Sequence, residues 1–244
     1  MQLFEQNNSS YSFEIFSTSH LVMVALFLFG CFFLYFVRHR LAGHKTIMRV
    51  IFLLLLLFLE GSYHYWLWIG GEWDVSFALP LHLCSISVLL CMLLLILQKR
   101  LLFQLTYYIG IAGATMAILT PELFFGYPHF RYFQFFLIHI IIVWTALLYI
   151  FSFKFSPTSK GVVTAFISLN IFASVAAVIN YVTGGNYMFL SHKPATGSVL
   201  DFFGPYPYYI LVLEGVALLL FVLMYLPFKS RRKDPLKKRK QLVD

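Results

Sequence analysis

A histidine and a cysteine stand two residues apart, as His82 and Cys84, in the stretch LPLHLCSIS over residues 79–87. A second histidine, His139, lies much further along the chain within FFLIHIIIVW. A cysteine thiol becomes a nucleophile when a nearby base takes its proton, and histidine is the most frequent base of this kind. These residue types therefore point to a thiol that an imidazole activates as a nucleophile.

The spacing decides which histidine can be the base. On one continuous helix, His82 and Cys84 would point about 200° apart, so they could not act at the same point. Cys84 then needs its base from another helix, and His139 is the candidate of matching depth. Each residue also has a simpler interpretation, as inert filler or as a packed histidine with one hydrogen bond. We predict that Cys31 and Cys91, in purely apolar sequence, are such fillers.

Several more polar residues interrupt apolar segments, where ionisable groups are costly and usually mark functional sites. Those predicted to support the pair or to bind substrate are Glu60, His64, His82, Gln134, Asn180 and Glu214. Glu60 and His64 share a helical face at i, i+4, so the carboxylate can orient the imidazole. The alternative is that these residues are hydrogen-bonding groups that fix helix packing.

The same side chains permit two other kinds of function. His64, His82 and His139 with Glu60 could hold Zn²⁺ and leave one position for water. The spacing matches no compact metal motif, and the three histidines come from different segments. A transporter or receptor would use the polar groups only to bind a ligand or relay protons. For the thiol and imidazole pair we expect neither a cofactor nor a bound metal.

The composition defines the elements that position these residues. Of the 244 residues, 60% are hydrophobic and 11% are charged, whereas soluble domains carry about 25% charged residues. We predict an all-α polytopic membrane protein with seven transmembrane helices, in one domain over residues 1–228 with a basic tail over 229–244. The predicted spans are residues 20–37, 47–69, 79–97, 101–120, 131–151, 162–183 and 206–227, each close to the roughly 20 residues that cross a bilayer.

The positions of the basic residues predict the orientation. All Lys and Arg residues except Arg131 and Lys193 fall on one side of the seven-span arrangement. The positive-inside rule then places the N-terminus outside and the C-terminus in the cytoplasm of a multi-pass cell-membrane protein. The polar residues fall in the outer half of the membrane, which predicts a pocket open to the outside or to the outer leaflet. The loop over residues 184–205 either closes over this pocket or only connects two spans.

The net charge of +8 is explained by this topology, so we do not expect nucleic acid as a partner. The basic tail could contact anionic lipids, at about 1 kcal/mol per charge near the surface. The alternative for the tail is a solvated topology signal.

LPLHLCSIS, FFLIHIIIVW, the loop GGNYMFLSHKPATGSVLDFFGPYPYYI and the seven spans together resemble the YwaF-type bacterial integral membrane proteins, over residues 10–228. That family is distantly similar to a eukaryotic transmembrane acyltransferase that moves polyunsaturated acyl chains onto ether-linked lysophosphatidylethanolamine. The resemblance implies catalytic roles for Cys84 and His139. It implies a lipid acyltransferase with membrane phospholipids and lysophospholipids as substrates. The alternatives are a metal-dependent membrane lipid hydrolase and a non-catalytic binding or transport protein.

Overall fold

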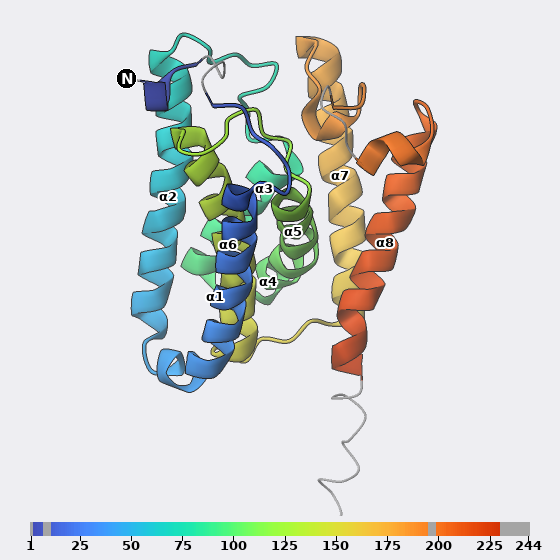
Figure 1. Ribbon diagram of the computed structural model, residues 1–244. Helices are drawn as coiled ribbons and strands as arrows, with labels where there is room; N and C mark the ends of the chain where they lie inside the picture. Colours follow the sequence, from blue (N-terminus) through green and yellow to red (C-terminus); the bar gives the residue numbers. More distant parts are fainter. Residues whose placement is uncertain (1, 7–10, 195–198, 230–244) are drawn as a thin grey trace, which may run out of the picture.

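The computed structural model describes residues 2–6, 11–194 and 199–229, and no extended strand occurs in these ranges. Seven helical rods alternate in direction through the molecule (Figure 1). The rods are α1 (Thr18–Ala42), α2 (Lys45–Ile69), α3 (Leu83–Leu97), the continuous run of α4 (Arg100–Leu105), a π-helical turn (Thr106–Gly110) and α5 (Ile111–Leu119), then α6 (Phe130–Phe151), α7 (Ser159–Thr183) and α8 (Tyr208–Lys229). Short 3₁₀ turns occur at Gln2–Phe4, Tyr187–Phe189 and Val199–Phe203.

Among these rods, six are long and apolar enough to cross a membrane. The prediction of a polytopic helical membrane protein is therefore confirmed. The remaining rod, α3, has 15 residues, a length of about 22 Å against a hydrocarbon core of about 30 Å.

The helix of the predicted third span begins at Leu83, four residues after the predicted start of that span at residue 79. The Leu79 N–H donates to the Tyr187 hydroxyl at 2.9 Å. The His82 ring also packs on the Tyr187 ring, with centroids 5.0 Å apart. These contacts hold the preceding segment outside the helix, and their partner lies 108 residues away in the sequence from Leu79. Local periodicity carries no information about such a distant contact.

α6 is the central helix of the bundle. Of its 18 most apolar consecutive residues 67% are buried, against 11% for α8. α6 packs against α1, α2, α3 and α5, whereas α7 and α8 pair with each other at one side (Figure 1). The main apolar core nevertheless draws residues from every rod, including Phe27 of α1 and Phe221 of α8.

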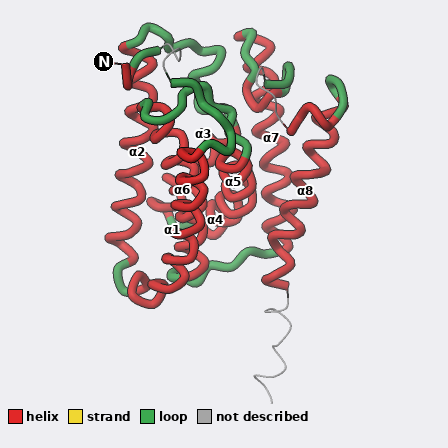
Figure 2. Tube along the Cα trace, viewed as in Figure 1, coloured by secondary structure: helices red, strands yellow, loops and turns green. Residues whose placement is uncertain are grey.

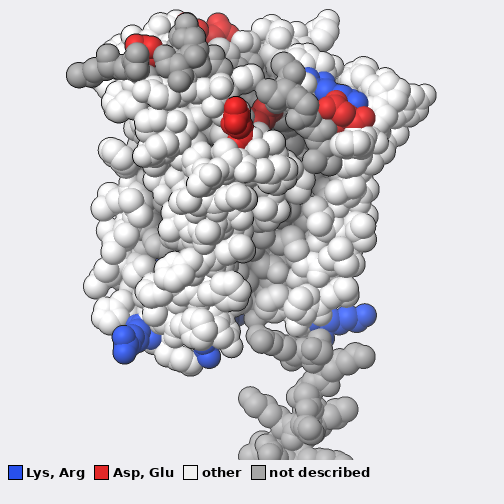
Figure 3. Space-filling model, viewed as in Figure 1, with Lys and Arg blue, Asp and Glu red and all other residues white. Residues whose placement is uncertain are grey.

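The longer connections gather at one end of the bundle (Figure 2), which we call the loop end. It carries the N-terminal segment and the connections over residues 70–82, 120–129 and 184–207. The opposite end, here the basic end, holds a set of cations at helix termini and short connections (Figure 3): Arg38, Arg40, Lys45, Arg49, Lys99, Arg100, Lys154, Lys160 and Lys229. The acidic side chains visible in Figure 3 lie toward the loop end. The rest of the basic tail, residues 230–244, lies outside the described residues, as does its predicted contact with anionic lipid.

A polar cluster between α2, α3 and α6

Cys84 occupies the first turn of α3, with His82 as the N-cap residue. The backbone of His82 is extended, at φ −66° and ψ 148°, and its side chain makes no capping hydrogen bond. The first hydrogen bond of the helix runs from the Ile86 N–H to the His82 carbonyl at 3.0 Å. The free amides at a helix N-terminus favour a negative charge beside them, and cysteines at this position are more reactive as thiolates. The Cys84 thiol is half-buried at this helix terminus, where the free amides favour a negative charge and the Glu60 carboxylate of α2 opposes one.

His139 is 4% exposed and has one defined hydrogen bond. Its Nδ1 atom lies 2.6 Å from the Phe135 carbonyl oxygen. Because a carbonyl oxygen only accepts, Nδ1 carries the proton and donates it. The neutral ring then has its lone pair on Nε2, which is buried and has no hydrogen-bond partner. His139 is thus held in the tautomer that a general base requires.

Two contacts define how α3 and α6 lie against each other. The Cys91 thiol donates to the Ile142 carbonyl at 4.0 Å, between residues 51 positions apart. The Tyr149 hydroxyl donates to the Leu94 carbonyl at 2.9 Å, between residues 55 positions apart. The two helices therefore run in the same direction, with sequence offsets of 51 and 55 residues at these two contacts.

Applied to Cys84, these two offsets give positions 135 and 139, the turn from Phe135 to His139. Cys84 precedes Cys91 by seven residues, so both lie on one helix face to within about 20°. Because Cys91 contacts α6, we expect Cys84 to lie on the side of α3 that faces this turn.

α2 contributes a carboxylate and an imidazole to this region. The Glu60 carboxylate lies 3.6 Å from His64 Nε2, so the predicted pairing of these i, i+4 residues is present. The Trp73 indole N–H donates to His64 Nδ1 at 3.2 Å, which leaves the His64 proton on Nε2, toward Glu60. The Glu60 carboxylate also interacts electrostatically with Cys84.

Arg131 lies at the loop end of the same region. Its guanidinium carbon sits 4.0 Å above the Tyr63 ring centroid, and its Nη1 donates to the Gln134 side-chain carbonyl. The Gln134 amide in turn donates to the Leu59 carbonyl at 3.3 Å. Gln134 therefore connects α6 to α2 and helps to fix the guanidinium.

Arg131 was not among the predicted site residues. The sequence feature that could have identified it is its position, because Arg131 and Lys193 are the two cations away from the basic side. The charge of Arg131 acts on both Glu60 and His139. We refer below to this set of residues as the interior cluster: Glu60, His64, Cys84, Arg131, Gln134 and His139.

The N-terminal segment covers the loop end of the interior cluster. The Trp66 indole N–H donates to the Phe4 carbonyl at 2.8 Å, and the Gln6 amide donates to the Trp66 carbonyl at 2.9 Å. The His129 Nε2–H donates to the Glu5 carbonyl at 2.9 Å. Trp66 itself lies beside Arg131, 6.0 Å from the guanidinium. These contacts join the N-terminal segment to α2 and to the start of α6, next to Arg131.

His82 faces the long loop rather than the interior cluster. Its Nδ1 accepts the Met188 N–H at 3.4 Å, and its ring packs against Tyr187 and Phe189. The predicted separation of about 200° between His82 and Cys84 on one helix is wrong. His82 precedes the helix and has an extended backbone.

Asn180 is also directed toward the long loop. Its side-chain oxygen accepts the Tyr187 N–H at 2.7 Å, and its amide donates to the Tyr187 carbonyl at 3.0 Å. Both polar ends of the buried Asn180 side chain are therefore used in anchoring Tyr187. The structure does not bring Asn180 to the interior cluster.

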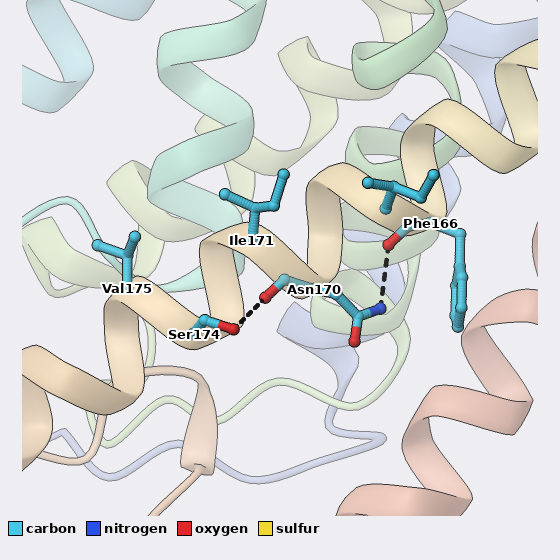
Figure 4. A pocket seen from close by; sticks show the side chains of 6 residues that line it. Phe166, Asn170, Ile171, Ser174 and Val175 are labelled. Atoms are coloured by element: carbon cyan, nitrogen blue, oxygen red, sulfur yellow. Dashed lines mark hydrogen bonds between the residues drawn. The ribbon is translucent and has the colours of Figure 1, made fainter.

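Glu214 belongs to a separate set of polar residues, here the α7–α8 cluster: Asn170, Ser174 and Glu214. The Asn170 amide donates to the Glu214 carboxylate at 2.9 Å and to the Phe166 carbonyl at 3.0 Å. The Ser174 hydroxyl donates to the Asn170 carbonyl at 2.8 Å. Figure 4 shows Asn170 and Ser174 along a hollow of about 410 Å³ on α7. The hollow is lined by residues of that helix alone and contains no titratable group.

The predicted alternative of a metal site finds no matching geometry. Within residues 2–6, 11–194 and 199–229, no three His, Cys, Asp or Glu side chains converge in a way that could hold a metal ion. The three histidines of that alternative bind different partners: His64 binds Trp73, His82 binds Met188 and His139 binds Phe135.

Comparison with known proteins gives the family. A sequence model of the TMEM164 family matches residues 15–225, so the chain belongs to this family. The chain is also similar to an uncharacterized protein of Treponema pallidum (strain Nichols), with 28% identity over 211 residues that cover 84% of this chain and 85% of the relative. No solved structure matches the chain.

Proposed function

We propose that this member of the TMEM164 family is a thiol-dependent acyltransferase that moves acyl chains between membrane phospholipids and lysophospholipids. The observation that carries the proposal is the state of His139, whose unprotonated Nε2 is buried and unpartnered. It belongs to the helix turn that Cys84 faces from the first turn of α3. A base without a partner, level with a thiol at a helix N-terminus, is the arrangement that nucleophilic acyl transfer requires.

In the first half of the reaction, His139 Nε2 takes the proton of the Cys84 thiol. The thiolate attacks the ester carbonyl carbon of the donor lipid and forms a carbon–sulfur bond. The ester carbon–oxygen bond then breaks, and the departing lysophospholipid oxygen takes the proton from His139. The free amides at the N-terminus of α3 are suited to stabilise the oxyanion that forms during the attack.

In the second half, an acceptor hydroxyl gives its proton to His139 and attacks the thioester carbon. The carbon–sulfur bond breaks, and the sulfur recovers the proton from His139. The covering N-terminal segment limits water at the site, which favours transfer to a lipid over hydrolysis. Glu60 and His64 are proposed to influence the charge state of Cys84 and His139 electrostatically.

We further propose seven membrane crossings, with the N-terminus outside and the C-terminus in the cytoplasm of the cell membrane. The grouping of cations at the basic end supports this orientation. The proposed third crossing combines α3 with the turn residues 79–82 that precede it. The likeness to YwaF-type proteins, with a histidine and cysteine at matching positions, remains part of this proposal.

Intact-protein mass spectrometry tests the function. The full-length protein is extracted from membranes that contain phospholipid, together with Cys84→Ser and Cys91→Ser variants. We expect a fatty-acyl mass that hydroxylamine removes, present in the wild type and in Cys91→Ser but absent from Cys84→Ser. Cys91 is the matched control because it lies on the same face of α3, two turns from Cys84.

A hydroxylamine-sensitive acyl mass that persists in Cys84→Ser would contradict the assignment of the nucleophile. Absence of any acyl mass on the wild type, with excess phospholipid and rapid acid quenching, would count against the acyl-transfer function.

A further inference from the structure

Arg131 is a cation inside the bundle with most of its hydrogen-bonding capacity unused. Among the described residues, the contacts within 4.0 Å between an acidic and a basic side chain join His64 to Glu60 and Lys193 to Asp201, and neither includes Arg131. A guanidinium has five N–H donors, and here one hydrogen bond of the side chain is defined, to Gln134. An unpaired charge in an apolar environment is unfavourable unless an opposite charge arrives. This arrangement provides a place for an anion.

The surroundings of Arg131 select the kind of anion. Glu60 on α2 acts electrostatically on Arg131, but its carboxylate lies 3.6 Å from His64 Nε2 and forms no ion pair with the guanidinium. The Tyr63 ring covers one face of the guanidinium at 4.0 Å, so the remaining N–H groups are available at its edge. A guanidinium edge binds two oxygens of one carboxylate or phosphate group. In a membrane, the abundant group of this type is the phosphate of a lipid.

The depth of Arg131 fits such a lipid when its ester lies at Cys84. Arg131 precedes the top of the Phe135 to His139 turn by four residues, which is about 6 Å along the helix axis. In a glycerophospholipid, the phosphorus atom and the nearer ester carbonyl carbon are separated by about five bonds, or roughly 6 Å when extended. A phosphate at Arg131 therefore places an acyl ester level with the Cys84 thiol.

We propose that Arg131 binds the phosphate of a glycerophospholipid and so positions its acyl ester at Cys84. The inference rests on the proposed function for the ester, whereas the phosphate site stands on the contacts of Arg131 itself. It makes Arg131 a positioning residue that determines specificity. Phospholipids are accepted as acyl donors, and neutral glycerides with the same chains are poor donors.

Donor specificity tests the positioning role. The purified full-length protein is given either phosphatidylcholine or diacylglycerol with identical acyl chains, and the rate of acylation at Cys84 is measured over a range of donor concentrations. In Arg131→Gln we expect the rate with phosphatidylcholine to fall by about tenfold or more, mainly through a weaker apparent affinity. The slow rate with diacylglycerol should fall much less, because this donor has no phosphate to lose. Arg131→Lys should recover part of the preference, because it keeps the charge but loses the planar edge.

Lys193→Gln is the control, because Lys193 is the other cation at the loop end and bonds to Asp201 at 3.8 Å. Its donor preference should equal that of the wild type. An equal loss with both donors in Arg131→Gln, or an unchanged preference, would overturn the proposal. Arg131→Lys maintains the test if the glutamine variant fails to fold.

A binding measurement separates this inference from the function. In a Cys84→Ser background, a short-chain phosphatidylcholine below its micellar concentration is titrated against the protein, with tryptophan fluorescence as the signal. Trp66 lies 6.0 Å from the guanidinium and reports on its surroundings. We expect the added Arg131→Gln change to raise the Kd by about tenfold. An equal Kd in both proteins would overturn the phosphate site, even if Cys84 is acylated. A raised Kd without any acylation of the wild type would support the site and contradict the acyltransferase.

Discussion

The interior cluster and the α7–α8 cluster both place polar side chains among apolar helices, but they differ in how their hydrogen bonds are used. On α7 and α8, the Asn170 amide binds both Phe166 and Glu214, and the Ser174 hydroxyl binds the chain one turn before it. In the interior cluster, the Nε2 atom of His139 is buried without a partner. The α7–α8 cluster makes its hydrogen bonds to neighbouring residues, whereas the interior cluster keeps an acceptor atom free to bind a ligand.

This difference separates structural polar groups from chemical ones. A buried polar atom without a partner costs about 1–3 kcal/mol, so its presence calls for a function that uses it. The Thr106 and Ser152 hydroxyls are the other unpartnered buried atoms in the described part of the chain. Neither hydroxyl is a base near neutral pH, whereas an imidazole nitrogen is. The unpartnered atom of His139 is thus the one with a clear chemical use.

The largest effect expected from this comparison is on catalysis. His139→Ala should lower the rate of Cys84 acylation by about 10²–10⁴-fold, because the thiol loses its base. Glu214→Gln should keep the rate within about twofold, since Glu214 bonds to Asn170 on the far pair of helices. The measurement is the rate of acyl-enzyme formation in detergent at neutral pH. Similar losses in both variants would contradict the distinction between the clusters.

The comparison also predicts opposite effects on stability. Asn170→Leu removes the bond to Glu214 and leaves that carboxylate unpaired, which should cost about 1 kcal/mol and lower the Tm by roughly 2–4 °C. His139→Phe replaces the unpartnered ring with an apolar ring of similar shape and should leave the Tm unchanged or raise it. Thermal unfolding of both variants under identical detergent conditions provides the test. A clear stabilisation by Asn170→Leu would mean that the α7–α8 cluster is not structural.

The smallest effect concerns a carboxyl that lies in a loop outside both clusters. Burial raises the pKa of Glu122 from its ordinary value of 4.5 to about 7, against the lowering effect of nearby His192. The folded state then holds this proton more tightly than the unfolded state, so stability contributed by the protonated form is lost as pH rises from about 4.5 to 7. Because the side chain is only partly buried, Glu122→Gln should reduce this loss by about 1–2 °C in Tm.

A series of Tm measurements from pH 5 to 7.5 checks this last prediction. Lys193→Gln is the matched control, since it changes a charge in the neighbouring loop and keeps the Glu122 carboxyl, whose pKa is raised. Equal pH dependence in Glu122→Gln and the wild type would show that the carboxyl does not contribute to this dependence.

Much of the site could be predicted from local sequence. The i, i+4 spacing of Glu60 and His64 predicted their pairing, because helix geometry places such residues on one face. The apolar runs predicted most rods, since a helix forms all its backbone hydrogen bonds within one segment, as lipid requires. The roles of Asn180 and Glu214 could not be assigned, because their partners are set by which helices and loops meet. For Arg131, the sequence showed only that this cation lies away from the side on which most Lys and Arg residues fall.

The sequence by itself determined that the chain forms apolar helices, that its cations gather on one side, and that a thiol and several imidazoles are placed among them. These properties depend on composition and on spacing within single helices. The tertiary structure alone decided where α3 begins, because Tyr187 holds the turn before it from far along the chain. It also decided the offset between α3 and α6. Contacts between distant segments set these features, and no local pattern records them.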